Sequence, residues 1–185
     1  MDNIDQKNMS AKSFLFPGLY SSLVIIATCI TFYGGYTNYI NKVTIIGWLL
    51  IIPFCVGAML YARNAMYNGY IGGKDAVKEG FKFIMFSTLL LVIFQCIFFT
   101  LDFKVYKINF MQTYGIELAK EQIKNGHLKI TEAEIPGLIS KEIEQVTLFR
   151  ECTSIVFKNL FLGTITAILC AVILRGRPRT NFSSN

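Results

Sequence analysis

FIMFSTLLLVIFQCIFFTL, residues 83–101, is a run of 19 residues without a charged side chain, bracketed by Lys82 and Asp102. A helix adds about 1.5 Å per residue, so crossing a bilayer core of about 30 Å takes about 20 residues. Backbone groups in lipid must be bonded within the chain, and this run lacks the period-two alternation of membrane-barrel strands. It therefore predicts a membrane-spanning helix near residues 82–102.

Three further apolar runs have the length of a membrane span. Residues 13–41 and 43–62 carry no charge, and residues 152–174 carry only Lys158, whose ammonium can reach the membrane surface. A cleaved signal peptide fits the first run less well, because its uncharged stretch is long for one. We therefore predict an all-α chain, an integral membrane four-helix bundle forming a single domain over residues 1–185, with spans near 15–37, 43–62, 82–102 and 153–174.

The composition agrees with this class of protein. The chain is 53% hydrophobic and 16% charged, whereas about a quarter of the residues in a soluble domain are charged.

Basic residues predict the orientation. With four spans, both termini lie on one side of the membrane, and the long segment 103–152 lies on the other. Nine of the eighteen Lys and Arg residues fall in the short segments on the side of the termini: Lys7, Lys12, Arg63, Lys74, Lys78, Lys82, Arg175, Arg177 and Arg179. The positive-inside rule then places both termini in the cytoplasm and residues 103–152 outside it. The same cations account for the net charge of +6, so we expect no nucleic-acid partner.

The cytoplasmic loop NAMYNGYIGGKDAVKEGF, residues 64–81, is rich in glycine and charge. Asn68 and Gly69 are expected to end the second helix with a left-handed cap, and a short interfacial helix should lead into the third span. The loop lacks the spacing and the Ser or Thr of a P-loop, so we expect no nucleotide to bind.

Parts of this loop resemble a known family. The residues that carry the resemblance lead into a membrane helix: Asn68, Gly69, Ile71, Ala76, Gly80 and Phe81. Together with the final run LFLGTITAILCAVILRGRP, residues 160–178, they resemble the small four-helix bacterial membrane proteins grouped as domain of unknown function family 4199. Gly72, Gly73 and Val77 depart from the pattern. The resemblance implies the four-helix architecture and a place in the bacterial inner membrane, without an assigned activity.

The segment after the third span shows helical patterning. Apolar residues recur at spacings of three and four, which predicts that the third helix continues past the bilayer with a stripe formed by Ile108, Met111, Tyr114 and Leu118. Asn125 and Gly126 are expected to end it.

A second amphipathic helix is expected after this stop. TEAE, residues 131–134, is a capping box, and Pro136 with Gly137 should break the chain again. A second stripe then predicts a helix running directly into the fourth span: Ile139, Ile143, Val146 and Phe149. The two helices are expected to form an extracytoplasmic helical hairpin over residues 103–152.

Small and polar residues inside the spans have structural interpretations. Glycines allow helix backbones to approach closely in lipid. The candidates for such helix packing are Gly34, Gly35, Gly47, Gly57 and Gly163. Gln95 needs a hydrogen-bond partner within the bilayer, such as Thr28 or a backbone carbonyl.

Groups for catalysis are scarce. No Asp, Glu, Arg or His lies inside the spans away from the helix ends, His127 is the single histidine, and the five cysteines have no metal-site spacing. We therefore expect neither an enzyme nor a bound cofactor or metal.

Two functions remain after this exclusion. The first is a noncatalytic scaffold or accessory subunit that binds a protein partner, or a second copy of the chain, through Tyr106, Phe110, Leu138 and Leu148. The alternative is a small oligomeric transporter or channel with a polar path near Gln95.

Overall fold

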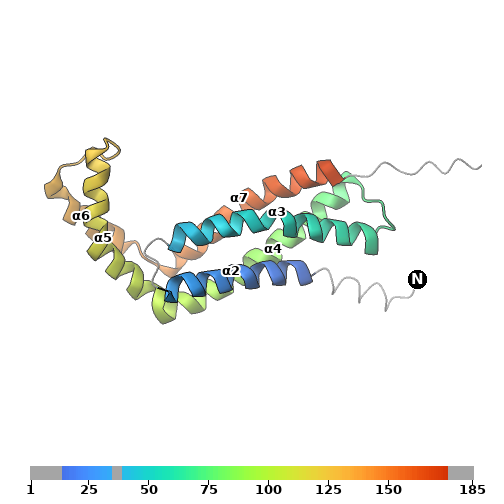
Figure 1. The fold of residues 1–185 in the computed structure, drawn as a ribbon, viewed down its shortest axis with the longest axis horizontal. Helices are drawn as coiled ribbons and strands as arrows, with labels where there is room; N and C mark the ends of the chain where they lie inside the picture. The colour runs from blue at the N-terminus through green and yellow to red at the C-terminus, as the bar shows by residue number, and fades with distance from the viewer. Residues whose placement is uncertain (1–13, 35–38, 175–185) are drawn as a thin grey trace, which may run out of the picture. The chain divides into compact units, whose positions relative to one another are not determined.

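The computed structural model describes residues 14–34 and 39–174, and every regular element within these ranges is helical. The helices are α2 (Leu15–Tyr33), α3 (Tyr39–Ala65), α4 (Gly73–Phe98), α5 (Lys104–Lys124), α6 (Ile135–Glu144) and α7 (Leu148–Leu174). Figure 1 traces their order. Four stretches are long and apolar enough to cross a membrane: Leu15–Tyr33, Ile45–Ala65, Gly73–Lys124 and Leu148–Leu174. The prediction of an all-helical chain with four apolar helices is confirmed.

The chain divides into two compact units. The first unit contains residues up to Leu91 together with those from Val156 onward, and the second contains Val92–Ile155. The first unit is therefore built from α2, α3, the beginning of α4 and most of α7. The second contains the end of α4, α5, α6 and the start of α7. Each unit is described separately below.

Ring and hydroxyl contacts join α2 to its neighbours in the first unit. Tyr20 is 2% exposed; its hydroxyl donates to the Gly47 carbonyl at 3.3 Å, and its ring lies 5.6 Å from that of Phe83. Ser21 donates to the backbone carbonyl of Ser87 at 3.3 Å. These contacts bind α2 to both α3 and α4.

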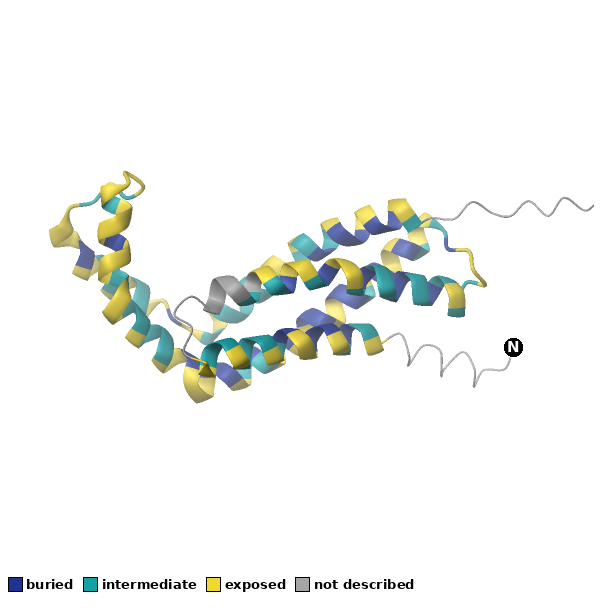
Figure 2. Ribbon diagram, viewed as in Figure 1, coloured by how far each residue is buried: buried dark blue, intermediate teal, exposed yellow. Residues whose placement is uncertain are grey.

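Two glycines allow α7 to approach α4 closely. A Cβ atom added at Gly163 would lie 2.8 Å from side-chain carbons of Ile84, and one at Gly80 would lie 2.9 Å from the Cβ of Ala167. Real Cβ atoms do not approach other atoms so closely, so these positions require glycine at this helix separation. Figure 2 shows the result as buried positions along one side of each helix and exposed positions along the other.

The loop between α3 and α4 turns on two left-handed residues. Asn68 has φ +50° and Gly69 has φ +83°, and the Gly69 amide donates to the Arg63 carbonyl at 2.8 Å. The left-handed cap is thus confirmed, although α3 already ends at Ala65. The short helix predicted to lead into the third span is the beginning of α4, which starts at Gly73 and continues into the apolar run without a break.

The third predicted span is part of a much longer helix. α4, a π-helical turn at Phe99–Phe103, and α5 follow one another from Gly73 to Lys124, a continuous 52 residues. The prediction that the helix continues beyond the apolar run is confirmed. Gly126, with φ +71°, ends it, and the His127 amide donates to the Gln122 carbonyl at 2.9 Å. The π-helical turn was not predicted.

The start of α6 confirms one prediction and corrects another. Thr131 and Glu134 form the capping box, with the Thr131 amide donating to Glu134 Oε2 at 2.8 Å. Pro136 does not break the chain but lies in the first turn of α6. Proline is favoured there because the first amides of a helix have no partner within the helix.

The predicted fusion of the second amphipathic helix with the fourth span is wrong. α6 ends at Glu144 and α7 begins at Leu148. Thr147 supplies the reason, since its hydroxyl accepts a hydrogen bond from the Arg150 amide at 3.3 Å and so caps α7. The Arg150 guanidinium also donates to Gln145 Oε1 at 2.6 Å, which holds the break between the two helices.

α5 and α6 pack against each other through small and aliphatic residues. Ile139 Cδ1 lies 3.5 Å from the position of a Cβ at Gly115, and Ala119 and Ile135 are buried. The predicted stripes need correction here. Tyr114 and Leu118 are 43% and 46% exposed, and Phe149 belongs to α7 and is 81% exposed.

Candidate functional site

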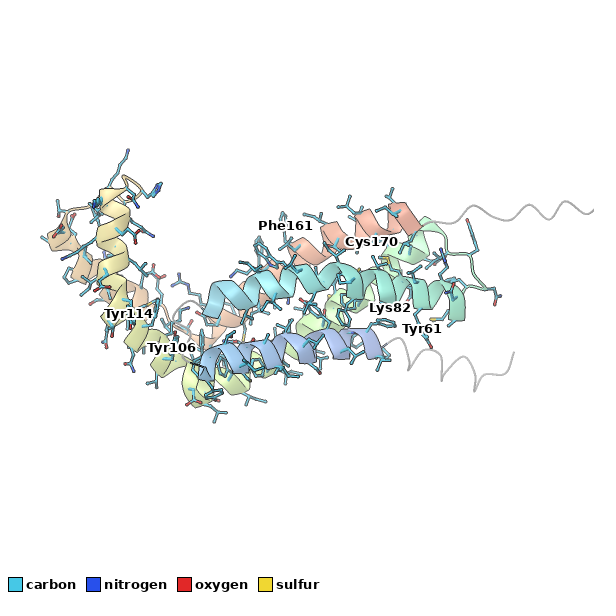
Figure 3. The ribbon with its side chains drawn as sticks, viewed as in Figure 1. Tyr61, Lys82, Tyr106, Tyr114, Phe161 and Cys170 are labelled. Carbon is cyan, nitrogen blue, oxygen red and sulfur yellow. The ribbon has the colours of Figure 1, made fainter. Side chains whose placement is uncertain are left out.

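A row of apolar side chains, two half-buried and two exposed, runs along α5. Its members recur every four residues, and we call them the aromatic ridge: Tyr106, Phe110, Tyr114 and Leu118. Successive rings touch, with centroids 6.1 Å apart between Tyr106 and Phe110 and 5.4 Å apart between Phe110 and Tyr114. Figure 3 labels Tyr106 and Tyr114 on this helix. The ridge presents aromatic surface beside the face that α5 packs against α6.

The far end of the aromatic ridge carries negative charge. Glu117 and Glu121 follow Tyr114 by three and seven residues, a spacing that puts them on the same side of the helix. Both are exposed, and neither carboxylate forms an ion pair within the described ranges. The neighbouring Lys120 approaches Glu132 to 4.0 Å instead.

The predicted partner-binding residues are divided among three helices. Tyr106 and Phe110 belong to the aromatic ridge and are half-buried. Leu138 lies on α6 and Leu148 begins α7, and both are half-buried. The ridge continues to Tyr114 and Leu118, which belong to the first predicted stripe and are exposed.

Polar and sulfur contacts join the helices at the base of the α5–α6 segment. We call this cluster the neck: Cys96, Phe103, Lys107, Glu151 and Cys152. Lys107 forms an ion pair with Glu151, both side chains being largely buried, and its ammonium lies 5.6 Å from the centroid of the Phe103 ring. The sulfurs of Cys96 and Cys152 are 3.8 Å apart. The neck therefore links α4 and α5 to the first turns of α7.

A buried carboxylate in the first unit was missed by the sequence pattern. Glu79 is 4% exposed and accepts a hydrogen bond from the Lys82 ammonium at 2.7 Å. The Tyr67 hydroxyl lies 3.5 Å from the same oxygen. Burial, followed by the nearby carboxylates of Glu79 and Asp75, raises the pKa of Tyr67, so its hydroxyl remains a neutral donor.

This buried carboxylate lines a small pocket with aromatic walls. The pocket residues come from α2 and the residue before it, from α3 and from α4: Phe14, Pro17, Ala58, Glu79, Lys82, Phe83 and Phe86. The signal that could have located it is the Glu79-x-x-Lys82 spacing, which places an acid and a base on one face of a helix.

The two polar residues predicted for a path through the membrane, Gln95 and Thr28, lie in different environments. Gln95 is 8% exposed on α4, and Thr28 donates to the Val24 carbonyl one turn back in its own helix at 2.7 Å. Such back-bonding satisfies the hydroxyl locally. Buried Thr88 is different, because its hydroxyl oxygen has no hydrogen-bond partner among the described residues.

The predicted packing glycines occupy several environments. A Cβ at Gly57 would lie 2.8 Å from the Phe16 ring, and one at Gly47 would lie 3.7 Å from the Tyr20 hydroxyl. Gly34 ends α2, where its amide donates to Ile30. Gly35 lies outside the described residues.

The loop residues Asn68, Gly69, Ile71, Ala76 and Gly80 have two structural roles. Asn68 and Gly69 make the turn, as described above. Ile71 and Ala76 are fully buried, and Gly80 meets α7. The loop is therefore part of the packing of the first unit.

Metal-binding geometry is absent from the described ranges: no three His, Cys, Asp or Glu side chains gather closely enough to hold an ion.

A comparison of the sequence with known families decides the classification. The family described as "Protein of unknown function (DUF4199)" matches residues 15–176. The chain belongs to this family. No curated protein and no solved structure matches the chain significantly. The match covers both units, including the aromatic ridge and the neck, and the resemblance noted in the loop is confirmed.

Proposed function

We propose that the protein is a noncatalytic scaffold or accessory subunit of the bacterial inner membrane. Four apolar helices of sufficient length support a multi-pass arrangement. The excess of Lys and Arg in the short segments supports cytoplasmic termini and an extracytoplasmic α5–α6 hairpin. The lipid bilayer is then the first partner of the chain.

The observation that carries the proposal is the aromatic ridge. Soluble surfaces rarely expose contiguous apolar rows, and a mere connection between two spans needs only a few residues. Here α5 has 21 residues and leaves Tyr114 and Leu118 more than two-fifths exposed. Tyrosine and phenylalanine are effective anchors at protein interfaces, because they bury a large area at a small cost in side-chain entropy.

The carboxylates beside the aromatic ridge indicate which kind of protein binds it. Glu117 and Glu121 stand beside the apolar row without a basic neighbour in ion-pair distance in the described part of the chain. A complementary partner is a protein helix with an apolar stripe and Lys or Arg at its edge. We therefore assign the ridge to such a heterologous protein and not to a second copy, whose own ridge would bring the same carboxylates together.

Site-specific photo-crosslinking in intact cells tests this assignment. Benzoylphenylalanine introduced at Tyr114 or Leu118 should give one discrete adduct with the same protein. At Asn109, which is exposed on another face of α5, it should give none. An adduct at twice the mass of the chain would show a second copy as the occupant and contradict the assignment. So would equal yields at all three positions.

Matched substitutions sharpen this test. Tyr114→Ser with Leu118→Ser, crosslinked from Phe110, should lower the adduct yield about tenfold or more, because truncating an interface anchor costs about 2 kcal/mol. Ile116→Ser is the control, since Ile116 is 40% exposed on α5 but lies outside the ridge. Equal losses in both variants would contradict the proposal.

The alternative function, a small oligomeric transporter or channel, rests on a different observation. Thr88 has a buried hydroxyl without a hydrogen-bond partner among the described residues, and Gln95 is buried further along α4. Ion or solute flux through liposomes containing the purified chain, lost on Gln95→Leu and retained on Thr28→Val, would favour it.

A further inference from the structure

Two thiols in the neck lie within reach of a covalent bond. The sulfurs of Cys96 and Cys152 are 3.8 Å apart, although the residues are 56 positions apart in the chain. Both are free thiols and both are partly accessible. A disulfide has sulfurs about 2 Å apart, so the two sulfurs need to approach each other by about 2 Å to form one.

The surrounding contacts hold this pair together. Glu151, adjacent to Cys152, is bound by Lys107 of α5, and the Lys107 ammonium also faces the ring of Phe103. The start of α7 is therefore fixed against the helix that contains Cys96 by groups other than the sulfurs. A second pair, Cys55 and Cys170 in the first unit, also interacts, but its thiols are 0% and 5% exposed. Accessibility thus distinguishes the two pairs.

We propose that Cys96 and Cys152 form a reversible disulfide that closes the α5–α6 segment at its base. The proposal rests on the orientation in the proposed function, which puts Cys152, and the end of the predicted span 82–102 toward which Cys96 lies, on the extracytoplasmic side, where disulfides form and persist. Residues 97–151, which include the aromatic ridge, would then form one covalently closed loop. The bond would restrain the two ends of the segment that presents the ridge.

The chemistry is a two-step thiol–disulfide exchange with a protein or small-molecule disulfide as the oxidant. One cysteine loses its proton and attacks a sulfur of the oxidant, which forms a mixed disulfide and releases one thiolate. The second cysteine loses its proton and attacks the mixed disulfide, which forms the Cys96–Cys152 bond and releases the second thiolate. The two protons convert the two released thiolates to thiols, so the oxidant gains the two electrons that the cysteines lose.

Oxidation of the purified full-length chain tests the geometry. After treatment with glutathione disulfide or with copper phenanthroline in air, the chain should be lighter by two hydrogen atoms and lose two of its five alkylatable thiols. Peptide mapping should find Cys96 joined to Cys152. Cys96→Ser and Cys152→Ser should each prevent the change, whereas Cys29→Ser should not affect it. Three results would overturn the proposal: no linkage with either oxidant, a separate oxidant adduct on each of Cys96 and Cys152, or a linkage of Cys55 to Cys170 instead.

Trapping in living cells tests the compartment. Rapid alkylation of aerobically grown cells should leave Cys96 and Cys152 protected until a reductant is added. A cysteine introduced at His127, between α5 and α6, reports topology independently through a membrane-impermeant maleimide.

The two possible failures are distinguishable. If His127→Cys is labelled from outside while Cys96 and Cys152 are found reduced, the disulfide is overturned and the proposed function stands. If His127→Cys is labelled only after the inner face of the membrane is opened, the α5–α6 segment is cytoplasmic. The proposed function and the proposed disulfide are then both wrong.

Discussion

The two units are stabilised by different means. In the first, helices approach through Gly80 and Gly163, and hydroxyls such as those of Tyr20 and Ser21 bond to backbone carbonyls of neighbouring helices. In the second, helix ends are capped by side chains and helices are joined by ion pairs. In the proposed membrane arrangement, apolar side chains of the first unit would gain little by leaving lipid, so close backbone packing is the means available to it. Caps and patterned apolar faces suit a unit that meets water.

The largest expected effect breaks the close packing of the first unit. Gly163→Leu should destabilise the protein by about 1–3 kcal/mol or more, because the new side chain meets Ile84 and overpacks the α4–α7 contact. Thermal unfolding in detergent measures the effect.

A second glycine provides the control for this substitution. Gly18 on α2 has no atom within 4 Å of its Cβ position, so Gly18→Leu should leave the melting temperature unchanged or raise it. Equal melting temperatures for the two variants would show that the α4–α7 contact is loose and would remove the contrast between the units.

A smaller effect is expected at Glu79, a buried acid of the first unit. Lys82→Met should cost about 1 kcal/mol, because it removes the ammonium from Glu79, which is 4% exposed, while Lys82 itself remains 43% exposed. Lys78→Met is the control, since Lys78 is exposed on the same helix and forms no ion pair in the described ranges.

A double variant checks that the loss arises from the unpaired carboxylate. Glu79→Gln added to Lys82→Met should recover part of the stability, because a neutral amide needs no counter-ion. If Lys82→Met and Lys78→Met have the same melting temperature, the Glu79–Lys82 pair contributes nothing measurable to stability. The first unit would then be stabilised without this ion pair.

The sequence predicted those features that one segment determines by itself. A run of 19 uncharged residues has the length of a bilayer core whatever packs against it, so the apolar helices were recognised. Asn125 with Gly126, and Thr131 with Glu134, act on their own backbone, so the end of α5 and the start of α6 were found. The break before α7 was missed because Val146 continues the apolar period, although Thr147 carries the signal of an N-cap.

The candidate sites depend on contacts between distant segments. Glu79 is part of a charged loop in the sequence, and it is buried because α4 begins at Gly73 and brings it beside Tyr67. Cys96 and Cys152 are 56 residues apart and share no local pattern. The spacing of four residues from Tyr106 to Leu118 was visible in the sequence. Whether these side chains are buried or exposed depends on where α6 packs, which the sequence did not show.

The smallest expected effect concerns the capping box of the second unit. Hydrogen bonds from the Thr131 backbone amide and hydroxyl lower the pKa of Glu134 below its ordinary 4.5. Because the folded pKa is below the unfolded one, the stabilisation is complete above pH 4.5 and is lost as the pH falls through the folded pKa. Hydrogen exchange over residues 131–138 should therefore be faster in Glu134→Ala than in the natural chain at neutral pH, and the difference should shrink below pH 4.5.

A glutamine at the same position separates charge from shape. The amide of Glu134→Gln can still accept a hydrogen bond from the Thr131 amide, as in other capping boxes, but it does not gain a proton in this range. Exchange in Glu134→Gln relative to Glu134→Ala should therefore change little with pH. Each comparison is made at one pH, so the intrinsic pH dependence of exchange cancels. A difference between the natural chain and Glu134→Ala that persists well below pH 4.5 would show that the carboxylate charge does not hold the start of α6.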